Sequence, residues 1–245
     1  GRGVGVLYQL WHLAGHHSRM KVRWCHFKPE REIIGAVLSK SGSGIAQLLI
    51  STTSWVGLFK ILAMFGSTAL AGYTIAVRLV MFALMPAWGL ANAGATLVGQ
   101  NLGAGKPERA EEAVKIATKF NILVLSVVGI GFVLFTGPLL RLFTSEPEVL
   151  AFGTQSLWIV SLAFPLYAAG MCFEAAFNGS GDTWTPARLN FMCLWVGQIP
   201  IAWILSKSLG FGPVGVFISV PVAFSLLAIW SWFLFKRGKW KMQKV

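Results

Sequence analysis

The chain has 245 residues, of which 55% are hydrophobic and only 12% are charged, and its formal net charge is +12. Soluble domains usually carry about 25% charged residues, so this composition excludes an ordinary water-soluble domain and indicates a protein that lies in a lipid bilayer. The positive charge alone would fit a nucleic-acid-binding protein. No motif of that class accompanies it, and we expect no nucleic-acid partner.

Residues 1–40 are predicted to be the end of a preceding transmembrane helix followed by a basic cytoplasmic linker. Residues 3–14 are apolar and aromatic but too few to span a bilayer, and basic side chains follow between His16 and Arg31. The chain begins with Gly1 and shows no signal-peptide pattern. We therefore expect a fragment of a longer protein, in which residues 41–245 form a transmembrane lobe.

Within residues 41–245, six uncharged stretches have the length of about 17–25 residues that a helix needs to cross the hydrocarbon layer. They show no strand-like alternation, and in lipid only helices or closed barrels satisfy the backbone. The sequence therefore predicts an all-α membrane protein built as one six-helix antiparallel bundle. The predicted spans cover residues 44–65, 79–98, 120–140, 150–173, 189–206 and 214–235. Prolines inside these spans predict kinks, at Pro86, Pro165, Pro200 and Pro221.

Lysine and arginine gather in alternate connections between the predicted spans. They precede the first span, lie between the second and third, follow the fourth, and close the chain between Lys236 and Lys244. The opposite connections hold little more than Arg141 and Lys207. The positive-inside rule then predicts a multi-pass protein of the plasma (inner) membrane whose C-terminus is cytoplasmic.

The residues that usually carry enzyme or metal chemistry are sparse. His12, His16 and His17 lie close together in the chain, but no further ligand follows at a fixed spacing, and the cysteines form no metal or disulfide pattern. No Ser/His pair, carboxylate pair or metal-binding motif falls within the spans. We expect neither an enzyme nor a metal or cofactor site.

Two glycine-rich segments follow the second and fourth predicted spans. The first runs from Gly99 to Ala110 and contains Gln100, Asn101, Gly103, Gly105 and Pro107. The second runs from Phe177 to Pro186 and contains Asn178, Gly179, Gly181 and Asp182. Together with AGYTIAVR at residues 71–78, they resemble hallmarks of the multidrug and toxic compound extrusion (MATE) family, in the order of its second half. The resemblance covers roughly residues 30–245.

From the residues alone, these segments have structural roles. Their glycines permit tight reversals, and Pro107 is suited to the first turn of the next helix. Thr185 followed by Pro186 predicts the N-cap of the fifth span. Phosphate binding by the glycines before Lys106 is disfavoured, because three nearby glutamates would repel a phosphate group.

Glu174 is the acidic residue flanked by span sequence, and it is our candidate for coupling to an ion. An ionisable group at membrane depth is costly and is a functional candidate by default. A second interpretation stays open, in which Glu174 lies at the cytoplasmic boundary and pairs with Arg188. Candidates for a substrate cavity are polar or aromatic residues on the spans or at their ends, namely Gln47, Thr52, Trp55, Tyr167 and Asn178.

The resemblance implies the C-terminal lobe of a twelve-span transporter whose partner is the missing N-terminal lobe of the same protein. It implies efflux of organic, often cationic, drugs in exchange for H⁺ or Na⁺ by alternating access. The coupling ion stays open, because the first span lacks the additional acid of some family branches. The alternatives are a lipid-linked oligosaccharide flippase, which the scarcity of cationic residues in the spans disfavours, and a non-transporting truncated scaffold.

Overall fold

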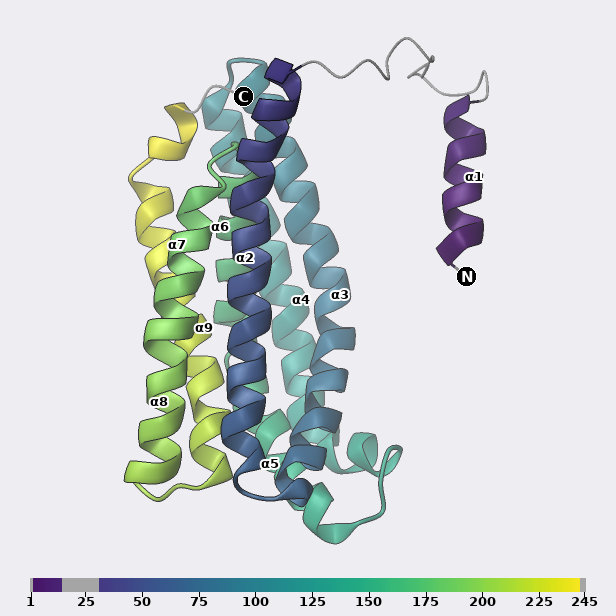
Figure 1. Ribbon diagram of the computed structural model, residues 1–245, viewed down its shortest axis with the longest axis vertical. Coiled ribbons are helices and arrows are strands. Elements are labelled where there is room, and N and C mark those ends of the chain that lie inside the picture. Colours follow the sequence, from purple (N-terminus) through teal and green to yellow (C-terminus); the bar gives the residue numbers. More distant parts are fainter. Residues whose placement is uncertain (1, 15–30, 243–245) are drawn as a thin grey trace. The chain divides into compact units, whose positions relative to one another are not determined.

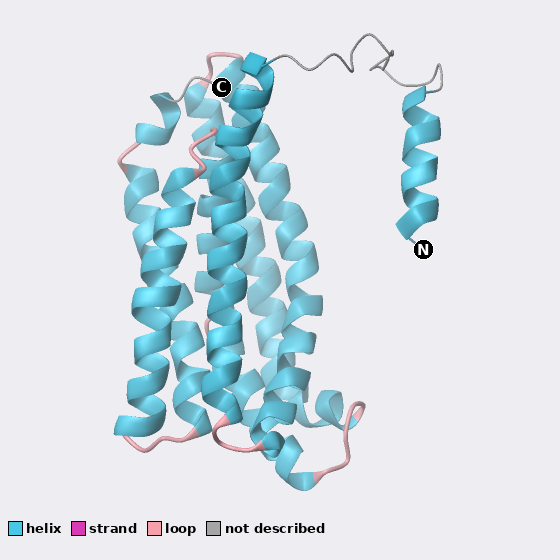
Figure 2. Ribbon diagram, in the orientation of Figure 1, coloured by secondary structure: helices cyan, strands magenta, loops and turns pink. Residues whose placement is uncertain are grey.

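A computed structural model describes residues 2–14 and 31–242 of the protein (Figure 1). Every regular element in these residues is a helix (Figure 2). Contacts divide the chain into two compact units, Gly1–Ser41 and Gly42–Val245. The first contains α1 (Arg2–Ala14) and the beginning of α2 (Arg31–Ala63). The predicted basic linker, apart from Arg31, lies outside the described residues.

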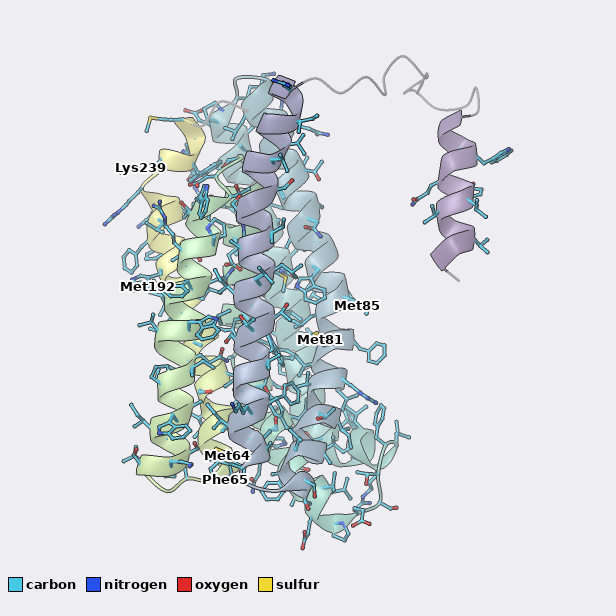
Figure 3. All side chains as sticks on the ribbon, in the orientation of Figure 1. Met64, Phe65, Met81, Met85, Met192 and Lys239 are labelled. Atoms are coloured by element: carbon cyan, nitrogen blue, oxygen red, sulfur yellow. The ribbon has the colours of Figure 1, made fainter. Side chains whose placement is uncertain are left out.

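The second unit is a bundle of long helices that run side by side in alternating directions (Figure 1). After α2 come α3 (Ser67–Gly103), α4 (Pro107–Arg141), α5 (Pro147–Leu162) and α6 (Phe164–Gly179). The next crossing combines α7 (Trp184–Asn190), η2 (Phe191–Gln198), α8 (Ile199–Trp203) and η3 (Ile204–Ser208). The chain then returns through α9 (Pro213–Lys236) and ends in the 3₁₀ turn η4 (Lys239–Met242). Met64 and Phe65 mark one end of this unit, and Lys239 marks the other (Figure 3).

The predicted six-span, all-α lobe is confirmed. Five described helical segments are long and apolar enough to cross a membrane, and the bent pair α5–α6 supplies a sixth when it is counted as one span. Large apolar side chains remain exposed at helical spacing along α4, at Ile116, Phe120, Leu123, Val127, Ile130 and Leu134. Such a stripe is unfavourable in water but suits contact with lipid tails.

Two of the predicted spans are much longer than expected. Helix α3 begins at Ser67 rather than at residue 79, and α4 begins at Pro107 rather than at residue 120. The prediction counted uncharged residues, which measure the hydrocarbon-buried part of a helix and not its full length. The early part of α3 carries Arg78 with its side chain exposed, and the first turns of α4 carry several charged side chains.

The helix axes bend at two places, one between α5 and α6 and the other within α4. The kink predicted at Pro165 in the span at residues 150–173 is present, because two helices meet there at Ala163 with a bend of 56°. Pro165 lies in the first turn of α6, where its ring nitrogen has no hydrogen to donate back to α5. In α4 the backbone leaves helical geometry at Phe135 (φ −110°, ψ 18°), three residues before Pro138. The predicted kinks did not include this position.

The core of the bundle consists of three apolar clusters. One joins α3, α4, α6, α7, η2, α9 and η4, and a second joins α3, α4, α5 and α6. The third joins α2 to α3, α8 and α9, and there Tyr73 stacks on Phe217 with ring centroids 5.6 Å apart. Helix α2 is thus held to the rest of the bundle along its second half.

Candidate functional site

Glu174 lies on α6 and is half-buried. One of its carboxyl oxygens is fully buried and has no hydrogen-bond partner, and the side chain of Asn190 in α7 interacts with the carboxyl group. Both ion pairs recorded among the described residues involve Glu111, so Glu174 is not paired there with Arg188. Glu174 is therefore a carboxyl group inside the bundle without a counter-charge.

One pocket is lined by this carboxyl group, and a second pocket shares two of its lining residues. Trp88, Tyr167, Glu174 and Phe224 are among the residues that line the first pocket. Tyr167 and Phe224 also line the second pocket, which is apolar, together with Trp55 and Tyr73. The rings of Tyr167 and Phe224 meet edge to face, with centroids 4.4 Å apart and an interplanar angle of 79°. The acid and the apolar pocket therefore lie on either side of one aromatic pair.

The structure brings two of the predicted cavity residues together. Trp55 from α2 and Tyr167 from α6 line the same apolar pocket, although they are far apart in the sequence. Aromatic faces attract organic cations, and Tyr and Trp do so most strongly when water is excluded. The arrangement therefore offers apolar and aromatic contacts on one side and a carboxylate close by.

Gln47 and Asn178 form a separate polar cluster at the end of the bundle where α6 is joined to α7. The Gln47 amide donates hydrogen bonds to the Asn178 side-chain oxygen (3.2 Å) and to the Thr183 carbonyl oxygen (2.8 Å). Ser43 donates to the Thr183 hydroxyl at 2.5 Å. This cluster ties α2 to the connection between α6 and α7. Thr52 is exposed on α2 and lines neither of the two pockets described above.

The two glycine-rich segments meet where α3 crosses α6. A Cβ atom built on Gly179 would lie 2.3 Å from the Ala95 carbonyl oxygen, and one on Gly99 would lie 3.2 Å from the Gly179 carbonyl oxygen. Only residues without a side chain allow the two backbones to come this close. The segments are therefore in direct contact with each other.

Both segments end their helices in the same way. Gly105 (φ 68°) and Gly181 (φ 83°) adopt left-handed conformations. The backbone amide of the next residue donates a hydrogen bond to a carbonyl oxygen in the last helical turn. Lys106 donates to Asn101 (2.8 Å), and Asp182 donates to Phe177 (3.0 Å). This pattern is the Schellman motif, in which a glycine closes the last helical turn.

The predicted N-cap at Thr185 is wrong. Helix α7 begins at Trp184, and Pro186 lies within its first turn. The Asp182 carboxylate accepts hydrogen bonds from the Thr185 amide (3.2 Å) and from the Thr185 hydroxyl (2.7 Å). Asp182 thus supplies the capping oxygen, because a carboxylate before the first turn satisfies an amide that the helix leaves free.

Several residues around Glu174 were not predicted. Trp88 and Phe224 line its pocket, but an apolar residue in an apolar span carries no mark of facing a cavity. Asn190 could have been predicted from the sequence, because it is a polar residue at the start of a predicted span. Among the described residues, no group of three His, Cys, Asp or Glu side chains is arranged to hold a metal ion.

The MatE family model matches residues 43–204 of this chain. The probable multidrug resistance protein NorM of Thermotoga maritima is 29% identical over 186 residues, which cover 76% of this chain and 40% of that protein. The probable multidrug resistance protein YoeA of Bacillus subtilis is 23% identical, with 90% of this chain and 47% of that protein covered. The FAD transporter of Shewanella oneidensis is 25% identical, with coverages of 77% and 41%. This chain therefore spans less than half the length of each of these relatives.

Solved structures agree on the fold. The crystal structure of MATE in complex with MaL6 has a TM-score of 0.88 at 23% identity, and the match covers 97% of this chain and 54% of that one. A MOP superfamily transporter from Pyrococcus furiosus has a TM-score of 0.89 at 23% identity, with coverages of 99% and 55%. The MATE resemblance of the sequence is thus confirmed, and members of this family are transporters rather than enzymes. The chain belongs to the MatE family of multi-pass membrane transporters.

Proposed function

We propose that the protein to which this chain belongs exports organic, often cationic, compounds in exchange for protons or sodium ions. The observation that carries the proposal is the unpaired Glu174 carboxyl group beside the Tyr167–Phe224 pair. A carboxylate in a pocket with aromatic walls suits a proton, a sodium ion or an organic cation. Names of two relatives, both described as probable multidrug resistance proteins, support drugs as the substrates.

The charge of the lining residues favours a cation over an anion as cargo. The two pockets contain one acidic side chain and no lysine or arginine. One relative is named as an FAD transporter, and FAD carries negatively charged phosphates. An anion of that kind would be repelled by an ionised Glu174, so we place this chain with the exporters of cations.

Coupling follows if Glu174 holds either the coupling ion or the substrate but not both. Binding of a proton or sodium ion neutralises the carboxylate and weakens its attraction for an organic cation, and the reverse holds by linkage. Alternating access would then be a rocking of this lobe against the second lobe of the whole protein. The bends at Ala163 and Phe135 are suited to such a movement, because they interrupt the helical hydrogen bonds of α5–α6 and α4.

We further propose that the end of the bundle with η4 faces the cytoplasm. That end carries most of the described basic residues outside the first unit, among them Lys106, Arg109, Lys115, Lys119, Arg188, Lys236 and Lys239. The opposite end carries Lys60, Arg78, Arg141 and Lys207. This asymmetry supports a cytoplasmic C-terminus.

The test is Glu174→Gln in the full-length transporter, which removes the charge and keeps the shape of the side chain. We expect drug resistance of the expressing cells to fall by about fivefold or more, the lower end of typical coupling effects. Glu148→Gln, at the exposed start of α5, is the matched control and should keep resistance. Membrane amounts are compared by immunoblot. Unchanged resistance of the Glu174 variant at equal amounts would refute its coupling role.

A further inference from the structure

An open groove lies between α4 and α9 at the end of the bundle that carries η4, apart from the Glu174 site. Both helices pack against α6, which supplies Phe173 to the floor of the groove. The groove has a volume of about 390 Å³, within the range of roughly 300–1,000 Å³ in which proteins bind small ligands. The polar and aromatic residues on its walls include Glu111, Lys115, Lys119, Trp232 and Lys236.

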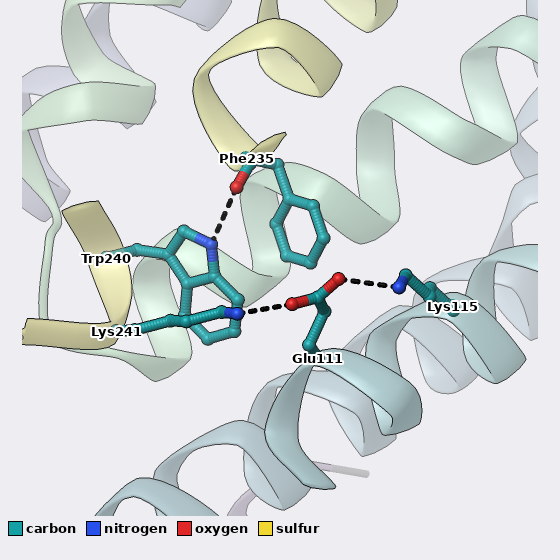
Figure 4. A network of polar contacts seen from close by, with 5 residues as sticks. All are labelled: Glu111, Lys115, Phe235, Trp240 and Lys241. Carbon is teal, nitrogen blue, oxygen red and sulfur yellow. Dashed lines mark hydrogen bonds and ion pairs between the residues drawn. The ribbon is translucent and has the colours of Figure 1, made fainter. Parts of the chain in front are cut away.

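The charge of the groove is positive, because its single glutamate is already neutralised. Lys115 lies 2.5 Å from one Glu111 oxygen, and Lys241 of η4 pairs with the other (Figure 4). Lys119 and Lys236 make no ion pair among the described residues. The Lys236 ammonium lies over the Trp232 ring, 4.8 Å from its centroid. Two lysines, one from each wall, are thus left to attract an anion.

The C-terminal turn holds Lys241 against Glu111, which lines the groove. Trp240 is 1% exposed and stacks on Phe235 with ring centroids 4.9 Å apart. Its indole nitrogen donates a 3.0 Å hydrogen bond to the Phe235 carbonyl oxygen (Figure 4). This anchoring keeps Lys241 against Glu111 and so keeps Glu111 from competing for Lys119 and Lys236.

The two unpaired lysines lie at the boundary between water and lipid. The uncharged run of α4 begins directly after Lys119, and that of α9 ends directly before Lys236. Beyond Lys119, the exposed stripe of α4 continues into the membrane with Phe120, Leu123 and Val127. Trp232, next to Lys236, is 41% exposed and has the amphipathic ring that is common at headgroup depth. Cationic and apolar surfaces therefore follow each other along the membrane normal.

We propose that this groove binds an anionic phospholipid, with the phosphate between Lys119 and Lys236 and the acyl chains along the exposed stripe of α4. Basic pockets between transmembrane helices suit anionic headgroups. A soluble phosphate would use the lysines alone, whereas a lipid also uses the apolar stripe directly below them. The proposal is independent of the transport function and of the role of Glu174.

The experiment uses the purified full-length protein in detergent. Phosphatidylglycerol and phosphatidylcholine with identical acyl chains are titrated separately, and bound lipid is counted by native mass spectrometry. We expect tighter binding of phosphatidylglycerol, and we expect Lys119→Gln/Lys236→Gln to weaken it by about 10- to 30-fold, from about 1 kcal/mol per lysine. The matched control is Lys60→Gln/Lys207→Gln, which removes two exposed lysines at the opposite end of the bundle. The control is matched because the Lys207 ammonium also lies over a tryptophan ring, 4.5 Å from the centroid of Trp203. The control variant should bind phosphatidylglycerol as tightly as the wild type does.

Three results would overturn the assignment. The first is equal affinity for the two lipids, and the second is an equal loss of affinity in the groove variant and the control. The third is full competition by glycerol phosphate at the concentration of the lipid, which would make the groove a site for soluble anions. Thermal unfolding of each variant separates lost binding from lost folding, and the single variants Lys119→Gln and Lys236→Gln provide the same comparison if the double variant unfolds.

Discussion

At the scale of single residues, the glycines of the two glycine-rich segments have different structural roles. Gly179 permits the close approach of α6 to α3, and Gly181 and Gly105 provide left-handed turns after their helices. Gly103 has helical geometry, and no atom lies within 4 Å of a Cβ built there. A single motif therefore contains positions that tolerate a methyl group and positions that do not.

Gly179→Ala should lower the free energy of unfolding by about 1–3 kcal/mol, because the new methyl group would overlap the backbone of Ala95. Gly103→Ala adds the same methyl group in open space and should leave stability unchanged or slightly raised, since alanine favours helix. Thermal or denaturant unfolding of the purified full-length protein measures both. Equal effects of the two substitutions would contradict the backbone contact between α3 and α6.

The sequence was enough to select candidate site residues by their chemistry, but not to predict which of them lie together. An acid in a span, and aromatic or amide side chains on spans, stand out in a sequence as apolar as this one. The sequence did not show that Trp55 and Tyr167 share a pocket or that Gln47 bonds Asn178, because those pairs form only when distant helices pack. Phe224 was not predicted at all, since phenylalanine in a span is as common against lipid as in a pocket.

At the scale of helices, the number of spans and the bend beside Pro165 were predictable, whereas the ends of the helices and the bend at Phe135 were not. Uncharged runs locate the part of a helix inside hydrocarbon, whereas α3 and α4 continue well beyond it. Prolines act differently according to their surroundings: Pro86 lies within the single helix α3, while Pro165 follows the break at Ala163. Whether a proline ends a helix depends on the packing around it, which local sequence does not specify.

The short turn η4 is a fixed part of the bundle, and Trp240 is its anchor. Trp240→Ala should lower the free energy of unfolding by about 3–5 kcal/mol, because it removes a fully buried ring, its stacking on Phe235 and a hydrogen bond. Trp230→Ala removes the same side chain from a position that is 47% exposed on α9 and should cost much less. Chemical denaturation of the full-length protein gives both values, and a similar loss for the two would show that η4 is not anchored through Trp240.

At the scale of the whole molecule, the alternation of basic connections predicts which end faces the cytoplasm. In a background without other cysteines, Ser145→Cys should react with an impermeant thiol reagent added outside intact cells. Lys239→Cys, at the opposite end of the bundle, should react only after the membrane is opened. The reverse labelling pattern would invert the proposed orientation.

Transport in proteoliposomes tests whether the whole protein uses an ion gradient to move organic cations. The full-length protein is reconstituted, a proton or a sodium gradient is imposed in turn, and the movement of a fluorescent organic cation is followed. We expect flux above protein-free liposomes with one of the two gradients, loss of that flux when an ionophore collapses the gradient, and loss of it in Glu174→Gln. Flux no greater than in protein-free liposomes under both gradients, with folded protein in the membrane, would contradict ion-coupled export of organic cations.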